Sequence, residues 1–265
     1  MAYATAIAAR TGGALRILTV LTHPGIYANP DVMGGVELVT DVIEQDAQAL
    51  LSRAAEQAYV EGVTCETLWR WGNVPQTILQ IAAEASHDLV VLGARRLSGW
   101  KRLRLGHIAN VVAAKARQPV LVVKQPPSTA PDVPLGRRLL VATEGSPWSD
   151  AAVDHALTLA QTQRFSVCLL HVLPGRHPSA AAEEEGHRIL GRAEGRAAVA
   201  GVPTTTMVTS GDAIAAIVNM ATEASCDGII LGSRGSSGWK RLMVGSVSNA
   251  VAVKSPLPVL IVKRL

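Results

Sequence analysis

The stretch at residues 232–249 reads GSRGSSGWKRLMVGSVSN and places three glycines and a serine at fixed spacings. Two residues separate Gly232 from Gly235, nine separate Gly235 from Gly245, and Ser246 follows directly. The loop comes after an aliphatic run, Gly-Ile-Ile-Leu, that is typical of a buried parallel strand. Glycine lets the backbone approach a ligand closely, so that successive N–H groups can surround an anion. The stretch therefore predicts a phosphate-binding loop at the end of a strand.

A short helix is expected after this loop, over residues 247–254, and Pro256 would end it. We expect Ser246 to be the N-cap of this helix, because a serine hydroxyl accepts hydrogen bonds from the first amides of a helix. Those amides, that of Val247 among them, also carry the positive end of the helix dipole and favour a bound phosphate. A glycine-rich surface loop ahead of an ordinary helix is the structural alternative.

The spacing excludes two common nucleotide-binding loops. The chain has no GxxxxGK[ST] sequence, and no GxGxxG stands between a predicted strand and a predicted helix. The sequence also has no serine nucleophile elbow and no carboxylate pair in a recognisable setting. We therefore assign no catalytic residue.

Composition favours a layered α/β protein. The chain has 265 residues, of which 48% are hydrophobic and only 3% aromatic, so the core must be built from aliphatic side chains and alanine. The net charge of +4 comes from interspersed basic and acidic residues, and few aromatic side chains are present to stack on bases. A specific nucleic-acid partner is therefore not expected. No apolar run reaches the ~20 residues that a membrane span needs.

The three cysteines, Cys65, Cys168 and Cys226, lie far apart in the sequence and form no CxxC pair. So sparse a set favours a reducing compartment and argues against a disulfide framework or a zinc site. The N-terminus lacks the basic region ahead of an apolar core that marks a secretory signal. We expect a cytoplasmic protein with no metal ligands of its own.

The sequence repeats with a long period. The sequence SGWKRL occurs at 98–103 and again at 237–242, and other residues recur at the same offset. A period of this length indicates two copies of one domain rather than a solenoid of short units. We predict one domain over 1–124 and a second over 137–265, joined by a proline-rich linker.

In the second copy, strands and helices are expected to alternate throughout. Such alternation predicts a parallel sheet with helices on both faces, in which ligands bind beyond the carboxyl ends of the strands. The expected strands are 138–143, 165–173, 204–208, 228–231 and 258–262, and the expected helices are 147–159, 180–200, 212–225 and 247–254.

The first copy begins late. Its residues 16–21 align with the second strand of copy two, so Met1 would already lie in the first helix and the first strand is missing. Copy one also carries about thirteen extra residues, around 23–35. Because the missing strand would be interior, its loss leaves backbone groups unpaired. We expect either that residues precede Met1 in the native protein or that segment 23–35 covers the gap.

The Gly-x2-Gly-x9-Gly-Ser spacing resembles the ATP-binding signature of the universal stress protein family. With both copies included, the resemblance covers nearly the whole chain. It implies two tandem doubly wound parallel-sheet domains of the adenine nucleotide alpha-hydrolase-like, Rossmann-like class, the first lacking its N-terminal strand. It also implies an ATP-binding protein with a role in stress response and signalling, with Mg²⁺ or Mn²⁺ as an optional companion of ATP, and AMP as an alternative ligand.

By the same resemblance, the nucleotide contacts the ends of three strands in copy two. The glycines and Ser246 would hold phosphates and ribose, and Val172 would offer its backbone to adenine. Glu144 stands where the family usually has aspartate. The resemblance implies nucleotide contacts by Ala142, Thr143, Glu144, Gly145, Val172, Gly232, Ser233, Arg234, Gly235, Gly245, Ser246 and Val247.

Copy one departs from the signature. Gly93 and Gly106 are kept, but Arg96 stands in place of the second glycine and His107 in place of the serine. Since a side chain at Arg96 would fill space that the phosphates need, we expect copy one to hold no nucleotide.

The last strand of each copy is aliphatic along its whole length, and in a doubly wound sheet it lies at an edge. A bare apolar edge favours pairing with another strand. We therefore expect antiparallel contact between residues 120–123 and 259–262, which would make the chain an intramolecular pseudo-dimer. A homodimer stays open.

Two other functions also stay open. One is an enzyme that uses ATP to adenylate or hydrolyse a small substrate on a related fold, and the other is an interaction module without nucleotide. No activating lysine or second substrate pocket is recognisable, and the complete glycine set in copy two disfavours the module. We expect slow ATP hydrolysis at most.

Overall fold

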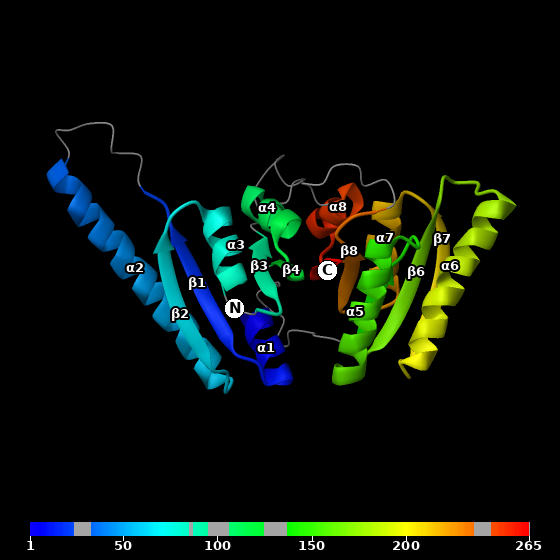
Figure 1. Ribbon diagram of the computed structural model, residues 1–265, viewed down its shortest axis with the longest axis horizontal. Coiled ribbons are helices and arrows are strands. Elements are labelled where there is room, and N and C mark those ends of the chain that lie inside the picture. The colour runs from blue at the N-terminus through cyan, green and yellow to red at the C-terminus, as the bar shows by residue number, and fades with distance from the viewer. Residues whose placement is uncertain (24–32, 85–86, 95–105, 125–136, 236–244, 265) are drawn as a thin grey trace. The chain divides into compact units, whose positions relative to one another are not determined.

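Seven strands form the larger sheet, and they come from both copies of the repeat. They are β3 (Val90–Ala94), β4 (Val120–Lys124), β5 (Arg138–Ala142), β6 (Ser166–Pro174), β7 (Thr204–Gly211), β8 (Gly228–Gly232) and β9 (Val259–Val262). Their order in the sheet is β3-β4-β9-β8-β5-β6-β7 (Figure 1). The structure is a computed structural model that describes residues 1–23, 33–84, 87–94, 106–124, 137–235 and 245–264.

Four helices alternate with the strands of copy two: α5 (Pro147–Gln163), α6 (Ala180–Val199), α7 (Ala213–Glu223) and α8 (Ser246–Lys254). Ser146, Ser179 and Asp212 cap the first three, because each side chain accepts a hydrogen bond from an amide of the first turn. The predicted alternation of strand and helix is confirmed, and only the ends of the elements differ.

The central strands of copy two are buried on both faces of the sheet. All residues of β8 and β9 are buried, as are the middle residues of β6. Helix α5 contacts α6, and α7 contacts α8. The connections through α5 and α6 lead outward from β5 to β7, and that through α7 leads back across the sheet to β8. Because crossover connections are right-handed, a reversal of direction moves the helix to the other face, so each pair of helices covers one face. The fold is therefore a doubly wound, Rossmann-like α/β sheet.

Strand β5 lies between β6 and β8, and all three are parallel. The chain passes from β5 outward to β6 and β7, and it then returns to the other side of β5 to form β8 and β9. The strand order thus reverses between β5 and β8. In open parallel sheets, this reversal opens a crevice at the carboxyl ends of the strands, and ligands bind there.

The last strands of the two copies pair with each other. β4 is antiparallel to β9, with Val120 opposite Ile261, Leu121 opposite Leu260 and Val122 opposite Val259. This pairing confirms the contact predicted between the two aliphatic strands. It places β3 and β4 in the same sheet as copy two.

A second, two-stranded sheet lies in the N-terminal part of the chain. The elements there are α1 (Ala2–Thr11), β1 (Leu15–Leu21), α2 (Met33–Val60), β2 (Cys65–Trp71) and α3 (Val74–Glu84). β1 is parallel to β2, and Ala8, Ala58 and Val63 form a small core beside them. Residues 1–85 form one compact unit and residues 86–265 form another.

The first copy lacks a counterpart of β5 among its described residues. There, β1 pairs with β2 and β3 with β4, but no described strand pairs with both β1 and β3. The predicted loss of the first strand is thus part of the fold, and α1 is the helix expected at the N-terminus. Part of the predicted insertion lengthens a helix, since α2 has 28 residues and its counterpart α6 has 20. The cover predicted for segment 23–35 falls largely outside the described residues.

Candidate functional site

The sequence-predicted residues gather at the carboxyl ends of β5, β6 and β8. Ala142 is the last residue of β5, Val172 lies two residues before the end of β6, and Gly232 is the last residue of β8. Because β5 pairs with both other strands, these ends adjoin the point where the strand order reverses. The structure thus brings together predicted residues that lie up to about a hundred positions apart in the sequence.

Gly232 is a glycine for a reason of packing. A Cβ at this position would lie 2.6 Å from the carbonyl oxygen of Trp148 and 2.9 Å from the backbone nitrogen of Ser149. Real Cβ atoms do not approach backbone this closely, so the glycine lets the first turn of α5 sit against the end of β8. Sequence reasoning assigned Gly232 to phosphate contact and missed this role.

The two ends of the glycine loop are joined by hydrogen bonds. The Gly245 amide donates to the Ser233 carbonyl at 2.9 Å, and the Ser233 amide donates to the Val262 carbonyl at 2.8 Å. The buried Ser248 hydroxyl donates to the Gly232 carbonyl at 2.6 Å. The end of β8, the start of α8 and the end of β9 are therefore held together.

The N-cap of α8 is Gly245, so the assignment of Ser246 to that position is wrong by one residue. Gly245 has φ −53° and ψ 145°, and no side chain caps the helix. Ser246 is the first helical residue and is exposed. Because the first amides of a helix have no carbonyl partner within it, α8 presents uncapped donors beside the loop. An oxyanion suits such a helix start.

Glu144 lies between the start of α5 and the glycine loop. Its Oε1 accepts a hydrogen bond from the Ser146 hydroxyl. A Cβ built on Gly235 would lie 3.7 Å from the same oxygen. The carboxylate therefore adjoins both the N-terminus of α5, where the helix dipole favours a negative charge, and the predicted phosphate loop.

A buried polar network supports the end of β5. The Thr143 hydroxyl donates to the Ser149 hydroxyl at 3.1 Å and accepts from the Gly145 amide at 3.2 Å. The Thr143 carbonyl lies 2.8 Å from Nδ1 of the buried His171. Since a carbonyl only accepts, Nδ1 of His171 carries the proton here. The histidine thus fixes Thr143 from β6.

Gly145 has φ +76°, in the left-handed region that favours glycine. A Cβ there would also lie 2.9 Å from the Ile189 side chain of α6. The turn between β5 and α5 therefore depends on a glycine at this position.

Ser149, which the sequence did not single out, stands three residues after the helix cap, a spacing typical of a first-turn contact.

Two cations lie at the loop. The guanidinium carbon of Arg234 is 5.9 Å from the centroid of the Trp148 ring, within the range of a cation–π interaction. Lys263 follows β9, and burial, with a smaller contribution from Arg234, lowers its pKa to about 8. Neither Trp148 nor Lys263 was predicted from the sequence, because each is remote from the glycine motif.

The corresponding loop of copy one has the same helix start. Gly106 is the N-cap of α4 (His107–Lys115) with φ −51° and ψ 146°, close to the values at Gly245. His107 is exposed at the first position of α4. Arg96 lies outside the described residues, and the prediction that copy one holds no nucleotide stays a prediction.

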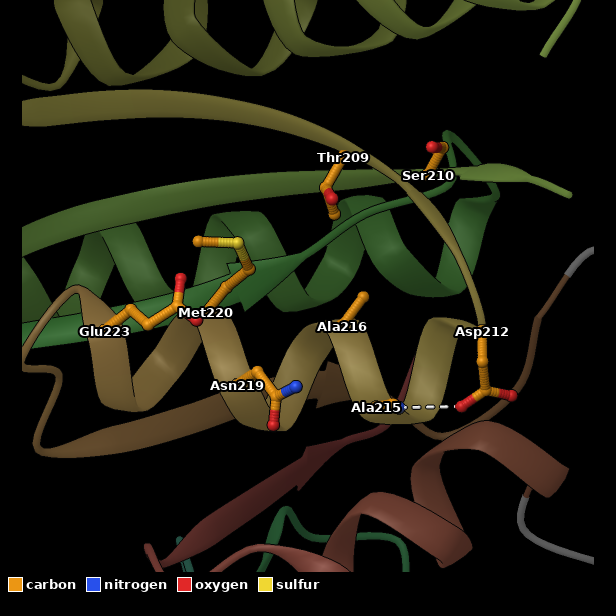
Figure 2. Close-up of a pocket in the computed structure, with 8 residues that line it drawn as sticks. All are labelled: Thr209, Ser210, Asp212, Ala215, Ala216, Asn219, Met220 and Glu223. Carbon is orange, nitrogen blue, oxygen red and sulfur yellow. Dashed lines mark hydrogen bonds between the residues drawn. The ribbon is translucent and has the colours of Figure 1, made fainter. Parts of the chain in front are cut away.

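A separate hollow of about 380 Å³ lies beside α7 and the end of β7 (Figure 2). Asp212 already serves as the cap of α7 there, since its Oδ1 accepts the Ala215 amide at 2.8 Å. None of the sequence-predicted residues lines this hollow. Its lining residues are Thr209, Ser210, Asp212, Ala215, Ala216, Asn219, Met220 and Glu223.

Within the described ranges, no group of three or more His, Cys, Asp or Glu side chains is arranged to hold a metal ion. No described helix is long and apolar enough to cross a membrane.

Parallel strands covered by helices, with a glycine loop at the strand-order reversal, define a Rossmann-like α/β protein. Residues 1–124 and 136–263 each match the model of the Universal stress protein family. The chain therefore belongs to the universal stress protein family.

Its relatives agree with this assignment. Universal stress protein YxiE of Bacillus subtilis is 35% identical over 147 residues, which cover 48% of this chain and 98% of that protein. Universal stress protein Rv2005c of Mycobacterium tuberculosis is 28% identical over 197 residues, 71% of this chain and 65% of that protein. The chain thus spans just under two thirds of the mycobacterial relative.

The fold is shared with a solved structure of the family. A crystal structure of a universal stress protein from Archaeoglobus fulgidus superposes with a TM-score of 0.74 at 22% sequence identity. The superposition covers 96% of this chain and 88% of that one. The agreement extends over both copies of the repeat.

Proposed function

We propose that this protein binds ATP in its second copy and acts in a stress response as a nucleotide-dependent signalling protein. One observation carries the proposal: the glycine loop closes on the uncapped start of α8 at the strand-order reversal, as the Gly245–Ser233 hydrogen bond shows. Backbone donors at such a point suit phosphate oxygens. Membership of the family supports the same ligand class.

Different residues of the site would contact the phosphates and the nucleoside. The amides of Gly235 and the first turn of α8 would donate to phosphate oxygens, and the Arg234 guanidinium would add a positive charge. Val172 and the segment 142–145 would line the nucleoside end, beyond the ends of β6 and β5. The buried network at Thr143 keeps this end rigid, which reduces the entropy lost on binding.

The described residues around Gly235 leave space for a ligand. Among them, only the Glu144 carboxylate would lie within 4 Å of a Cβ on Gly235. That carboxylate would repel the phosphates of metal-free ATP. A Mg²⁺ or Mn²⁺ ion on the phosphates would remove the repulsion, so we expect tighter binding of ATP with the metal than without it.

Calorimetric titration of the full chain with ATP tests the proposal. We expect one nucleotide per chain, because the glycine set is complete in copy two alone. Gly235→Val should abolish binding, since the branched side chain fills the space of the phosphates. Gly93→Val is the control in copy one, where a Cβ meets no described atom within 4 Å. Two equal sites per chain, or unchanged binding by Gly235→Val, would refute the assignment.

Turnover distinguishes the signalling role from the enzymatic alternative. A binding protein converts ATP slowly at most, whereas an adenylating enzyme releases product steadily when its substrate is present. Incubation with ATP and Mg²⁺, followed by chromatography of the nucleotides, measures this directly. Steady formation of ADP, AMP or an adenylate at many turnovers per chain would favour the enzyme.

A further inference from the structure

Two of the three cysteines meet in the core of the larger unit. Cys168 lies in the middle of β6 and is fully buried, and Cys226 lies in the turn between α7 and β8 with 5% of its surface exposed. Both thiols are reduced. The sequence placed them far apart, because nothing in their spacing shows that β6 and this turn are neighbours.

The local backbone directs Cys226 toward β6. Ser225 has φ 51°, a left-handed conformation that ends α7, and the Cys226 amide donates to the Ala221 carbonyl at 2.8 Å. This is the pattern that folds the residue after a helix back against its last turn. α7 packs on β6, and the amide of the next residue, Asp227, donates to the Arg138 carbonyl of β5 at 2.8 Å. Cys226 therefore lies beside the start of β5, close to Cys168 on the neighbouring strand.

A positive charge lies on the same face of the sheet. Cys168 is paired laterally with Leu140 and Thr205, so Arg138, two residues before Leu140, points to the same side. The Arg138 guanidinium donates to the Thr205 hydroxyl at 2.8 Å. Both side chains lie near Cys168, which is paired with Thr205 in the sheet.

These contacts separate the acidities of the two thiols. The neighbouring Cys226 thiol, with smaller contributions from Thr205 and Arg138, lowers the pKa of the Cys168 thiol against the opposing effect of burial. The neighbouring Cys168 thiol, together with burial, raises the pKa of the Cys226 thiol. Cys168 is therefore the more acidic thiol of the pair.

We propose that Cys168 and Cys226 form an oxidation site at which a peroxide converts the two thiols into an intramolecular disulfide. A thiolate is the nucleophile in such reactions, and a neighbouring thiol resolves the first product. A buried cysteine alone acts as a small apolar side chain. Here a second thiol in direct contact and a guanidinium beside the first add the elements of a redox pair.

The step balances in two stages. The Cys168 thiolate attacks one peroxide oxygen, the O–O bond breaks, and the leaving hydroxide takes a proton to become water while Cys168 becomes a sulfenic acid. The Cys226 sulfur then attacks the sulfenic sulfur, the S–O bond breaks, and the departing hydroxide takes the Cys226 proton to leave as water. Overall, hydrogen peroxide and two thiols yield one disulfide and two waters.

Entry of the oxidant is easiest at the turn. Cys226 is 5% exposed and Cys168 is fully buried, so the oxidant reaches the pair through an opening of this turn. Such an opening breaks the hydrogen bonds from the Cys226 amide to the Ala221 carbonyl and from the Asp227 amide to the Arg138 carbonyl, but it is a local event that leaves the strand pairing intact. The proposal therefore requires no unfolding of the nucleotide site, which lies at the opposite ends of the same strands.

The test treats the full chain with hydrogen peroxide, then alkylates the remaining thiols in denaturant and maps them by mass spectrometry. We expect Cys65 to stay alkylated and Cys168 and Cys226 to appear as one cross-linked peptide pair. Cys168→Ser and Cys226→Ser should both lose the cross-link, and Cys65→Ser should keep it. A Cys65 cross-link between chains, or three thiols still alkylated after prolonged oxidation, would overturn the proposal.

A second measurement separates the cross-link from damage. Because a disulfide restricts the unfolded chain, the oxidised wild type should melt at a higher temperature than the reduced wild type. Adding a thiol reductant should reverse this increase in melting temperature. In Cys226→Ser, peroxide should instead leave the melting temperature equal or lower, since Cys168 then has no resolving partner. A lower, irreversible melting temperature of oxidised wild type would contradict the proposal.

Discussion

Glycine serves two different purposes within residues 232–235. At Gly232 a Cβ would meet the backbone of α5, whereas at Gly235 the one described group within 4 Å is the end of a flexible carboxylate side chain. The first glycine is thus required by the fold, and the described packing does not require the second. A sequence motif does not separate the two cases.

Substitution by alanine should separate them. Gly232→Ala forces backbone apart at the start of α5 and should lower the free energy of unfolding by about 1–3 kcal/mol, the cost of an over-packed site. Gly235→Ala should leave stability within about 0.5 kcal/mol, because its contact is an ordinary one. Urea unfolding of both variants measures this, and equal losses of stability would show that the distinction is wrong.

Lys263 gives the chain a predictable pH dependence. Burial lowers its pKa from 10.5 to about 8, so the folded chain loses this proton at a lower pH than the unfolded chain. Between these two values the unfolded state binds more protons, and the stability contribution of Lys263 rises as the pH rises from 8 toward 10.5. Below pH 8 that contribution is at its lowest.

The comparison with Lys263→Met isolates this effect. The difference in unfolding free energy between wild type and variant should grow in favour of wild type above pH 8, by on the order of 2–3 kcal/mol in total. Urea unfolding at a series of pH values measures the difference. Parallel pH profiles for the two proteins would show that the lysine is not desolvated.

Among the elements, β4 and β9 form a self-complementary contact. Leu121 and Leu260, which are counterparts in the repeat, lie directly opposite each other. Asn249 donates to its own counterpart, Asn110, at 3.0 Å. Lys263 donates to the last carbonyls of α4, and Lys124 does the same for α8. Such reciprocity is the mark of an interface related by a two-fold axis.

We therefore propose that the two copies associate as the halves of a pseudo-dimer, with β4 and β9 at the centre. Replacing Leu121 and Leu260 together by Asp places two like charges face to face in a buried sheet, where an uncompensated charge costs about 3–5 kcal/mol. The melting temperature should fall, and small-angle scattering should show a more extended particle. An unchanged particle with unchanged melting temperature would place the main contact elsewhere.

The helices and strands were predictable from the sequence because short aliphatic runs that alternate with amphipathic segments are compatible with few arrangements other than a parallel sheet covered by helices. The cap of α8 was misplaced by one residue, since Gly245 caps through its backbone and leaves no side-chain signal. The position of Arg234 over Trp148 and the contact of Cys168 with Cys226 depend on which strands are neighbours. Sequence spacing alone does not show such contacts, because the order of strands in the sheet differs from their order in the chain.

At the scale of the whole molecule, the boundary between compact units does not follow the boundary between copies. Residues 86–124 of copy one belong to the larger unit, where β4 covers the edge of β9. If copy two were produced alone, that edge would be bare. An apolar edge strand is a template for pairing with another chain.

A chain of residues 137–265 should therefore dimerise through β9. We expect twice the monomer mass by light scattering, with the same antiparallel register that β4 now provides. The Leu260→Asp variant of this shorter chain is the matched control and should remain monomeric. A monomeric wild-type fragment with a cooperative melting transition would show that the edge needs no partner.

The pairing of β4 with β9 also bears on how the chain is made. Leu121 leaves the ribosome long before Leu260, its partner across the sheet, has been synthesised. At about 5–20 residues per second, the delay is roughly 7–28 s, far longer than most secondary structure takes to form. During that interval the nascent chain presents an unpaired aliphatic strand on each ribosome of a polysome. Strands of neighbouring nascent chains can therefore pair with the edge of β4 that β9 finally occupies. We expect a ribosome-associated chaperone that covers this edge to increase the yield of folded protein.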